Sequence, residues 1–323
     1  MLIKKPSDIK YSEITPKNVY LNRRNFLASA AAAGAAAVAA RPLAKWLSPQ
    51  LAHAAGAKLA VAKKSPFSTT EKETPYGDVT TYNNYYEFGT DKSDPSHYAT
   101  KFVTSPWSVS VEGEIAKPQK FSVDDLMKLA PLEERIYRHR CVEAWSIVVP
   151  WIGFSLSNLI NKVQPTSKAK YVQFFTDLDP KQMPGLAEGG LDWPYREGLR
   201  MDEAMHPLTT LCFGFYDQVL ANQDGAPLRT IIPWKYGFKS TKALVRVVVM
   251  QNQPETSWNT ANAHEYGFYS NVNPNVNHPR WSQATERRLG GSILSLSRIP
   301  TQMFNGYPEV ASLYTGMDLR KYY

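Results

Sequence analysis

Hydrophobic and polar residues alternate along several short stretches of the chain, which predicts strands. In WSVSVEG, residues 107–113, the side chains of Trp107, Val109 and Val111 share one face, opposite two serines and a glutamate. Three further runs are rich in branched and aromatic residues and predict buried strands: KYVQFFTD ending at Thr176, LTTLCFGF at 208–215 and ALVRVVVM at 243–250. The run IYRHRCV at 136–142 is also extended in character. No period of 20 to 50 residues recurs, so the pattern does not indicate a repeat fold.

Helix signals are few and short. In FSVDDLMKLAP, Ser122 is placed as a helix cap, Asp125 follows three residues later, and Pro131 lies beyond the end. GFSLSNLINKV predicts a second helix that begins near Ser155, and MDEAMHP predicts a helical turn stopped by Pro207. Short strands separated by isolated helices indicate an α+β fold with substantial sheet, in one domain.

The segment from 56 to 100 shows neither pattern. It begins with a polar stretch that contains two prolines and continues with an aromatic stretch rich in Asn, Gly and Asp. Such a composition is typical of irregular backbone. We therefore expect this segment to wrap around the domain as a loop without helices.

The first 54 residues carry the features of an export signal. NRRNFL at 22–27 has two adjacent arginines, fifteen uncharged residues follow at 26–40, and Arg41 comes next. This resembles a twin-arginine signal, and AHA at 52–54 offers a small-x-small cleavage site. A transmembrane anchor is the alternative, but the uncharged run is short for a span. We expect residues 1–54 to be a signal peptide, residues 55–323 to form the mature domain, and that domain to lie in the periplasm.

The export signal also changes the meaning of the net charge. Eight basic and two acidic residues lie before residue 55, so this segment carries +6 of the formal +8, and the mature chain is only about +2. A basic surface for nucleic acid or lipid is therefore not predicted. The twin-arginine pathway moves folded proteins, often after a cofactor is loaded, so the signal favours a bound cofactor.

The stretch YRHRCVEAWS, residues 137–146, contains one of the two cysteines. If it is extended, His139, Cys141 and Glu143 share one face of the strand. Neighbouring cationic groups would favour the thiolate form of Cys141, which binds metals and attacks electrophiles. The Glu143 carboxylate would stand where it can exchange protons with whatever the sulfur holds.

Other fates of Cys141 stay open at this point. In an oxidising compartment, two cysteines suggest a disulfide between Cys141 and Cys212. Against it, Cys212 lies in an apolar run, where a free cysteine behaves as a small hydrophobe. A cysteine nucleophile with a histidine partner is a third reading. Zinc is poorly supported, because the chain has no CxxC and no HExxH motif.

Four segments together carry a family resemblance: HRCVEAWS at 139–146, VVPW at 148–151, PWKYGFKSTK at 233–242 and YGFYSNVNPNVNHPRWSQATER at 266–287. They resemble the periplasmic protein-methionine-sulfoxide reductases of the sulfite-oxidase-fold molybdenum family, and the resemblance runs through essentially the whole chain. It implies a sulfite-oxidase-type molybdopterin-binding domain, α+β and sheet-rich with short helices. It also implies one molybdopterin with one molybdenum ion and Cys141 as the metal ligand, and a soft thiolate suits such a site.

The resemblance also implies roles for individual residues. Cys141, Glu143 and Tyr266 are expected to be catalytic. The expected cofactor contacts are Asn83, Tyr86, Glu87, Cys141, Thr176, Asp224, Arg229, Ser240, Thr241 and Lys242. Taken alone, these positions have ordinary readings: a turn for the asparagine, a solvated basic edge for 229–242, aromatic packing for Tyr266. Asp224 stands where the family usually has Asn, and an ionised Asp cannot donate a hydrogen bond, which makes this contact less secure.

The implied reaction is the reduction of methionine sulfoxide in periplasmic proteins, a repair of oxidised side chains. The implied partners are a membrane haem b subunit that oxidises quinol, oxidised periplasmic proteins as substrates, and the twin-arginine translocase during export. We expect a monomeric catalytic subunit and a shallow metal site. The rivals are another small S- or N-oxide reductase of the sulfite-oxidase family, a cofactor carrier without turnover, and a disulfide-stabilised binding protein.

Overall fold

The computed structural model describes residues 56–61, 63–290 and 298–323, which fall in one compact unit, His53–Tyr323. The predicted signal peptide, residues 1–54, lies outside the described residues. None of the helices in these ranges is long and apolar enough to cross a membrane.

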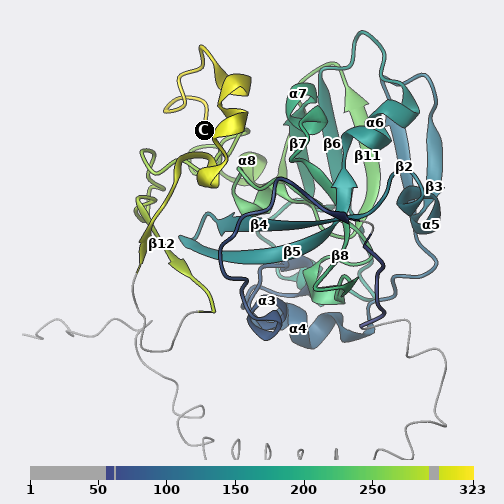
Figure 1. Cartoon of the computed structure of the whole chain (residues 1–323), viewed down its shortest axis with the longest axis horizontal. Helices are drawn as coiled ribbons and strands as arrows, with labels where there is room; N and C mark the ends of the chain where they lie inside the picture. The colour runs from purple at the N-terminus through teal and green to yellow at the C-terminus, as the bar shows by residue number, and fades with distance from the viewer. Residues whose placement is uncertain (1–55, 62, 291–297) are drawn as a thin grey trace, which may run out of the picture. The chain divides into compact units, whose positions relative to one another are not determined.

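One of the two sheets in the described ranges has five strands in the order β3-β2-β11-β6-β7. Strand β11 runs parallel to β2 and antiparallel to β6 (Figure 1). Three of these strands confirm predictions made from the hydrophobic pattern. The bounds are β2 Ser108–Gly113, β3 Gln119–Ser122, β6 Tyr171–Thr176, β7 Arg196–Arg200 and β11 Leu244–Met250.

The other sheet has eight strands. Five of them follow the path β1-β4-β5-β12-β13. Off this path, β8 pairs with β5, and β9 and β10 each pair with β8. Its long central hairpin, β4 and β5, ends at the functional site described below. The bounds are β1 Lys63–Lys64, β4 Glu133–Cys141, β5 Trp145–Ser155, β8 Thr210–Phe215, β9 Gln218–Val219, β10 Arg229–Ile231, β12 Thr285–Arg288 and β13 Ile299–Pro300.

Strand β5 was not predicted, and it holds a proline in its interior. Pro150 stands opposite Ile136, whose backbone N–H turns outward to the Ser68 hydroxyl at 3.0 Å. The nitrogen of Pro150 therefore faces away from β4 and toward the side of β8. The pairing of β5 with β8 ends one residue short of Pro150, where Trp151 stands opposite Phe215. A proline is tolerated in a strand where no ladder hydrogen bond needs its N–H.

The helices are short, as predicted. Ser122 caps α5 by accepting the Asp125 backbone N–H at 3.1 Å, while α6 begins two residues after Ser155 because Ser155 completes β5. The expectation that 56–100 holds no helix is wrong, since α3 and α4 lie there; α3 follows Pro75, and α4 has Pro95 in its first turn, where proline favours a helix start. The α-helix bounds are α3 Tyr76–Thr81, α4 Asp94–Tyr98, α5 Val123–Met127, α6 Ser157–Val163, α7 Met201–Met205 and α8 Ser257–Ala261.

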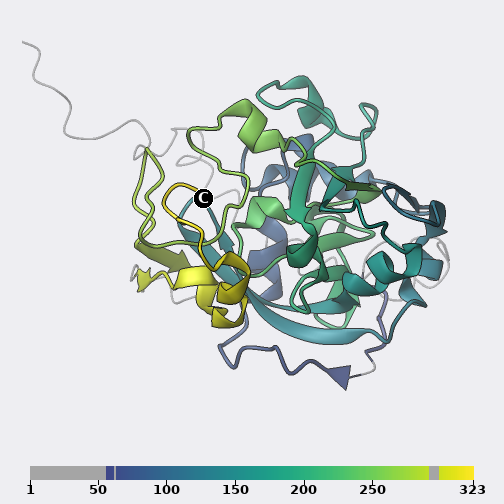
Figure 2. The same cartoon turned by 90° about the horizontal axis from the view of Figure 1, so that it is seen from above.

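Single turns of 3₁₀-helix complete many of the connections. They are η3 Tyr86–Phe88, η4 Ala99–Lys101, η5 Pro184–Ala187, η6 Asn222–Asp224, η7 Gly237–Lys239, η8 Met303–Gly306 and η9 Pro308–Tyr314. The last two form the C-terminal segment, at the opposite end from β2 and β3 in both cartoons (Figure 1, Figure 2).

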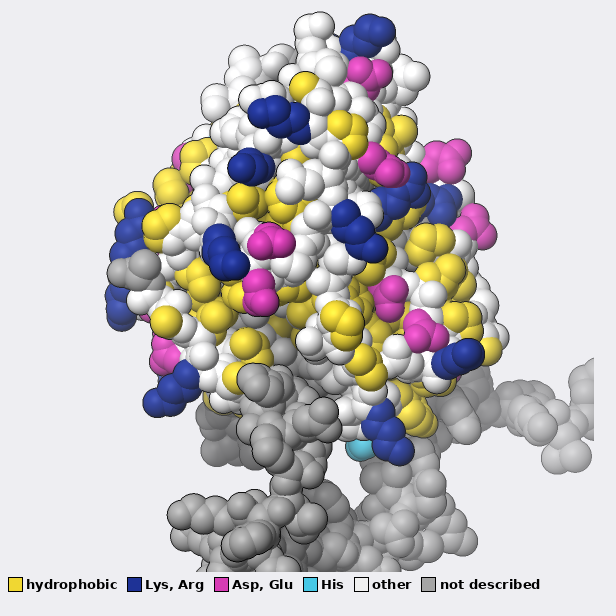
Figure 3. Space-filling view, turned by 90° about the vertical axis from the view of Figure 1, so that its right-hand side faces the viewer, with side chains coloured by type: hydrophobic (Ala, Val, Ile, Leu, Met, Phe, Trp, Pro, Cys, Tyr) yellow, Lys and Arg dark blue, Asp and Glu magenta, His cyan; other side chains and the backbone are white. Residues whose placement is uncertain are grey.

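One hydrophobic cluster joins the two sheets, with fully buried members such as Val109 of β2, Val149 of β5 and Phe215 of β8. Cys212 belongs to this cluster, and both Cys212 and Cys141 are free thiols. The disulfide alternative is therefore not the structure that the chain adopts. On the face in Figure 3, basic and acidic side chains are interspersed among hydrophobic and uncharged ones, consistent with the small net charge of residues 55–323.

Candidate active site

Cys141 lies at the tip of the β4–β5 hairpin. It pairs with Trp145, and the turn between them is closed by the Ala144 backbone N–H, which donates to the Cys141 carbonyl oxygen at 3.1 Å. Ala144 adopts a left-handed conformation with φ of 61°, as three-residue hairpin turns commonly require. Glu143 is therefore part of the turn and not of the strand. The turn, and not the predicted strand alternation, brings its side chain close to the sulfur.

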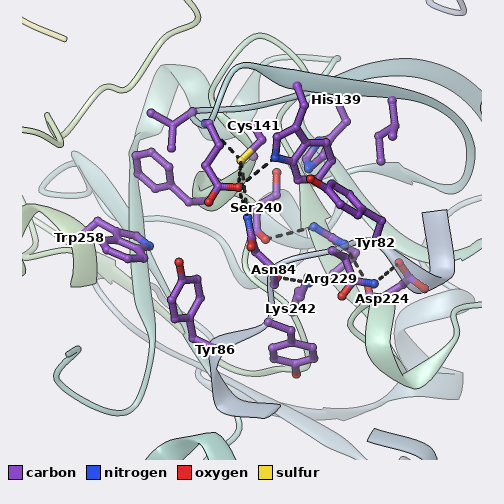
Figure 4. Close-up of a pocket in the computed structure, with 18 of the residues that line it drawn as sticks. Tyr82, Asn84, Tyr86, His139, Cys141, Asp224, Arg229, Ser240, Lys242 and Trp258 are labelled. Atoms are coloured by element: carbon purple, nitrogen blue, oxygen red, sulfur yellow. Dashed lines mark hydrogen bonds between the residues drawn. The ribbon is translucent and has the colours of Figure 1, made fainter. Parts of the chain in front are cut away.

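The sulfur and the carboxylate are linked to each other and to Asn84. Glu143 Oε2 is 3.6 Å from Cys141 Sγ, and the Asn84 side-chain amide donates to Oε2 at 3.0 Å and approaches Sγ at 3.6 Å (Figure 4). Glu143 also accepts from Trp145 Nε1 at 2.9 Å and from Lys92 Nζ at 3.1 Å. Burial opposes ionisation of this carboxyl, but these donors and the Lys92 charge hold its pKa below the ordinary value.

The neighbouring arginines do not activate the thiol. Burial of the sulfur, together with the Glu143 charge, raises the pKa of Cys141 to about 12. Arg138 is paired with Glu71, and Arg140 donates to Glu286 at 2.7 Å on the far face of the strand. Nearby cations do favour the thiolate as expected, since Lys92 and Arg140 lower the pKa of Cys141, but burial and the Glu143 charge outweigh them in the chain by itself.

Cys141 lines a cavity of about 470 Å³. The residues expected to form the site come together here from seven separate parts of the chain: Asn83, Tyr86, Glu87, Cys141, Glu143, Thr176, Asp224, Arg229, Ser240, Lys242 and Tyr266. Thr241 is the exception, since it is buried beside the cavity and donates its backbone N–H to the Thr230 hydroxyl at 2.9 Å. The residues of the site are spread along the sequence from 83 to 266, so only the tertiary fold brings them together.

Polar side chains occupy one end of this cavity. Asn83 Nδ2 donates to Asp224 Oδ1 at 3.3 Å, Arg229 Nη1 donates to the Asp224 carbonyl oxygen at 2.8 Å, and Lys242 Nζ donates to the Asn84 carbonyl oxygen at 2.5 Å (Figure 4). Burial raises the pKa of Asp224 and lowers that of Lys242. Burial likewise raises the pKa of Glu87 to about 7. These buried ionisable groups mark a site where a ligand is expected to complete the hydrogen bonding.

Several buried polar atoms of the cavity wall have no hydrogen-bond partner among the described residues. They are Asn83 Oδ1, Asn84 Oδ1, the Tyr85 hydroxyl, His139 Nδ1, Trp151 Nε1, Thr176 Oγ1, Asp224 Oδ2 and Arg229 Nε. Buried polar groups in folded proteins are nearly always paired, so a cluster of unpaired donors and acceptors indicates a polar ligand. A pterin with amide-like edges and a phosphate supplies both kinds of partner, so the wall fits that class of cofactor.

The wall residues that were not among the predicted contacts include His139 and Asn84. His139 projects into the cavity from β4, and burial lowers its pKa to about 3. Its ring lies against Gly237, where a Cβ atom would stand only 2.9 Å from Nε2, so a glycine is needed there. The sequence offered one signal for His139, since the predicted strand alternation placed it on the same face as Cys141. Asn84 follows Asn83 in an Asn-rich stretch, and no pattern distinguished it.

Sequence comparisons with known proteins agree with a molybdopterin site in this cavity. Residues 97–258 match the family described as the oxidoreductase molybdopterin binding domain. The chain is 56% identical to the protein-methionine-sulfoxide reductase catalytic subunit MsrP of Ralstonia nicotianae, over 98% of this chain and 96% of that one. It is 57% identical to the MsrP of Burkholderia mallei, over the full length of both. This chain belongs to the MsrP family.

A third MsrP, from Pseudomonas syringae pv. tomato, is 51% identical over the full length of both chains. Among solved structures, the sulfane dehydrogenase SoxCD from Paracoccus pantotrophus aligns with a TM-score of 0.42 and 16% identity, covering 64% of this chain and 53% of that chain. Membership in the MsrP family confirms the predicted fold class, an oxidoreductase domain that binds molybdopterin with molybdenum.

Proposed function

We propose that this chain is the catalytic subunit that reduces methionine sulfoxide residues in periplasmic proteins. One observation carries the proposal: a single free cysteine and a carboxylate stand 3.6 Å apart at the wall of a cavity with unpaired polar atoms, in a chain 51–57% identical to MsrP proteins. The overall reaction adds two electrons and two protons to the sulfoxide. The S–O bond breaks, and the products are methionine and water.

In this proposal Cys141 holds the molybdenum. The bound metal supplies the two-electron redox chemistry and the affinity for oxygen, and its charge favours the thiolate over the thiol. The polar end of the cavity holds the pterin and its phosphate. The residues proposed for it are Asn83, Glu87, Thr176, Asp224, Arg229, Ser240 and Lys242, with Thr241 supporting the loop from behind.

Glu143 is proposed to hold and deliver a proton beside Cys141. Its carboxylate is fixed by hydrogen bonds from Asn84, Trp145 and Lys92, so its position does not depend on the substrate. Tyr266 lines the same cavity, and its hydroxyl accepts from Arg280 at 3.3 Å. A fixed carboxylate that takes up and passes on a proton, and a hydroxyl near the reacting atoms, can serve the two protons of the reaction.

The location and the partners belong to the same proposal. Residues 22–41 resemble a twin-arginine signal, so the domain 55–323 would be exported folded, with its cofactor, to the periplasm. The relatives are named catalytic subunits, which implies another subunit. We propose that this partner is a membrane haem b protein fed by quinol, and that oxidised periplasmic proteins are the substrates.

One preparation tests the core of this proposal. The protein, exported through its own signal, would be analysed for molybdenum and then for oxidation of a reduced dye when methionine sulfoxide is added. We expect close to equimolar molybdenum and dye oxidation that depends on the sulfoxide. A carrier would contain molybdenum but leave the dye reduced, and a binding protein would contain very little metal. A sulfite oxidase would instead reduce an oxidised dye when given sulfite.

A further inference from the structure

The cavity around Cys141 has two chemically different ends. Asn83, Asp224, Arg229 and Lys242 gather at one end, where the unpaired polar atoms lie. Figure 4 shows Trp258 and Tyr86 on the other side of the cavity from Arg229 and Asp224, with Cys141 above and between them. If the polar end holds the pterin, as proposed above, the aromatic end is the part of the cavity left for another molecule.

The aromatic end is a continuous arc of rings. Tyr86 meets Trp258 edge to face with ring centroids 5.3 Å apart, Trp258 meets Tyr266 at 4.8 Å, and Tyr266 meets Phe238 at 5.6 Å. These rings come from η3, from α8, from the loop after α8 and from η7. All four line the cavity with Cys141, so the arc stands beside the sulfur and is not a separate surface.

Charges at this end are balanced within the protein. Arg280, at the rim, donates to Glu265 at 2.7 Å, and Lys92 donates to Glu143 at 3.1 Å. The carboxylate of Glu143 lines the same cavity and lies 3.6 Å from Cys141 Sγ as a fixed negative charge. An anion such as sulfite would find no free cation among the described residues here, whereas an uncharged group that is apolar at one end meets no penalty.

A methionine sulfoxide side chain has that character. Its methyl and methylene groups are apolar and carry partial positive charge next to the sulfur, which suits the negative faces of aromatic rings. Its oxygen is a strong hydrogen-bond acceptor. The Tyr86 hydroxyl points into the cavity beside Trp258 and is the donor that this oxygen would meet (Figure 4).

We propose that Tyr86, Trp258, Tyr266 and Phe238 form the subsite for the methionine sulfoxide side chain. The rings hold its methyl and methylene groups, and the Tyr86 hydroxyl donates to its oxygen. This inference rests on the proposed sulfoxide reductase activity and assigns the substrate end of that same site. It moves Tyr86 from the cofactor contacts, where the sequence had placed it, to the substrate.

The test uses the molybdenum-loaded protein and N-acetyl-methionine sulfoxide amide as the probe. Without a reductant there is no turnover, so calorimetric titration gives the Kd directly, and dye-linked assays give KM and kcat separately. We expect Trp258→Ala to raise both Kd and KM by about tenfold, because a large part of the apolar contact is lost. Trp258→Phe should retain most of the affinity, and Tyr86→Phe should raise the Kd by about five- to tenfold by removing one donor.

Two controls separate binding from damage. Tyr98 is 56% exposed on α4 and is not among the residues that line the cavity, so Tyr98→Ala and Tyr98→Phe are matched truncations outside the site and should leave Kd and KM unchanged. Molybdenum content and thermal midpoint should match those of the wild type in every variant. Methionine sulfone, which keeps the apolar groups, should compete with the probe, while sulfite should not.

The inference is overturned if Trp258→Ala and Tyr86→Phe both keep Kd and KM within twofold of the wild type while their molybdenum content is normal. It is also overturned if sulfite competes as well as the sulfone. If the wild type contains molybdenum and binds the probe but never turns it over, the proposed function fails while the subsite stands. The two failures are therefore distinguishable.

Discussion

The Glu143 carboxylate lies 3.6 Å from the sulfur of Cys141, held there by the tight turn that joins β4 to β5. The turn fixes the carboxylate through the backbone, and three side-chain donors fix it from the other sides. A metal held by the sulfur would therefore have a proton carrier beside it whose position changes little during the reaction.

Replacing the two cysteines should have different effects. Cys141→Ser should abolish dye-linked sulfoxide reduction, because a hydroxyl is a poor ligand for a soft metal site. Cys212→Ser should keep activity but lower the free energy of unfolding by about 1–3 kcal/mol, since it places a hydroxyl in the apolar cluster. Turnover and thermal denaturation of the two variants check this. Equal loss of activity in both would mean that the thiols act together, as in a disulfide.

Replacing Glu143 should slow turnover without releasing the cofactor. Glu143→Gln keeps the size of the side chain but cannot carry a proton, so we expect kcat to fall by about 10²-fold or more. Glu134→Gln is the matched control, because Glu134 lies on β4 away from the cavity and pairs with Lys64 of β1. Molybdenum content should be unchanged in both. A kcat for Glu143→Gln close to that of the control would remove Glu143 from the proton path.

Glu87 should make the stability depend on pH. Burial raises its pKa to about 7, so the folded state holds a proton that the unfolded state releases near pH 4.5. The contribution of protonated Glu87 to the free energy of unfolding is fully present below pH 4.5 and is lost as the pH rises through 7. Glu87→Gln should therefore gain stability relative to the wild type between pH 4.5 and 7, on the order of 3 kcal/mol.

Thermal midpoints measured from pH 4 to pH 8 check this dependence. Glu188→Gln, at an exposed position, should show a constant difference from the wild type across that range. A difference for Glu87→Gln that is also constant would mean that folding leaves the pKa of Glu87 unchanged.

Asp224 should tolerate replacement by Asn, the residue that the sequence resemblance leads us to expect at this position. In Asp224→Asn the side chain can still accept from a neighbour and gains a donor for the cofactor, so we expect normal molybdenum content. Asp224→Ala removes the acceptor of the Asn83 amide and should lower the fraction of chains that retain the cofactor. Metal analysis after gel filtration measures both. Loss of molybdenum in Asp224→Asn would mean that the negative charge itself is required beside Arg229 and Lys242.

Local patterns were sufficient for elements whose signals lie within a few residues. Ser122 caps α5, and the alternating run after Trp107 forms β2, because capping and side-chain alternation depend on near neighbours. Strand β5 escaped prediction because Pro150 is acceptable only when its neighbouring strands are known. The helices at 76–81 and 94–98 were missed because aromatic and Asn-rich composition outweighed the prolines at their starts.

The sequence by itself determined the class of chemistry. The motifs HRCVEAWS and PWKYGFKSTK identify the family, and proteins of this family bind the molybdopterin cofactor. Only the tertiary structure decided how the chain serves that chemistry. It paired Arg138 with Glu71 and Arg140 with Glu286, and it placed Arg229 and Asp224 on the other side of one cavity from Tyr86 and Trp258. Charge and burial depend on groups far apart in the chain, so the pKa of Cys141 and the direction from which a substrate approaches follow from packing and not from neighbouring residues.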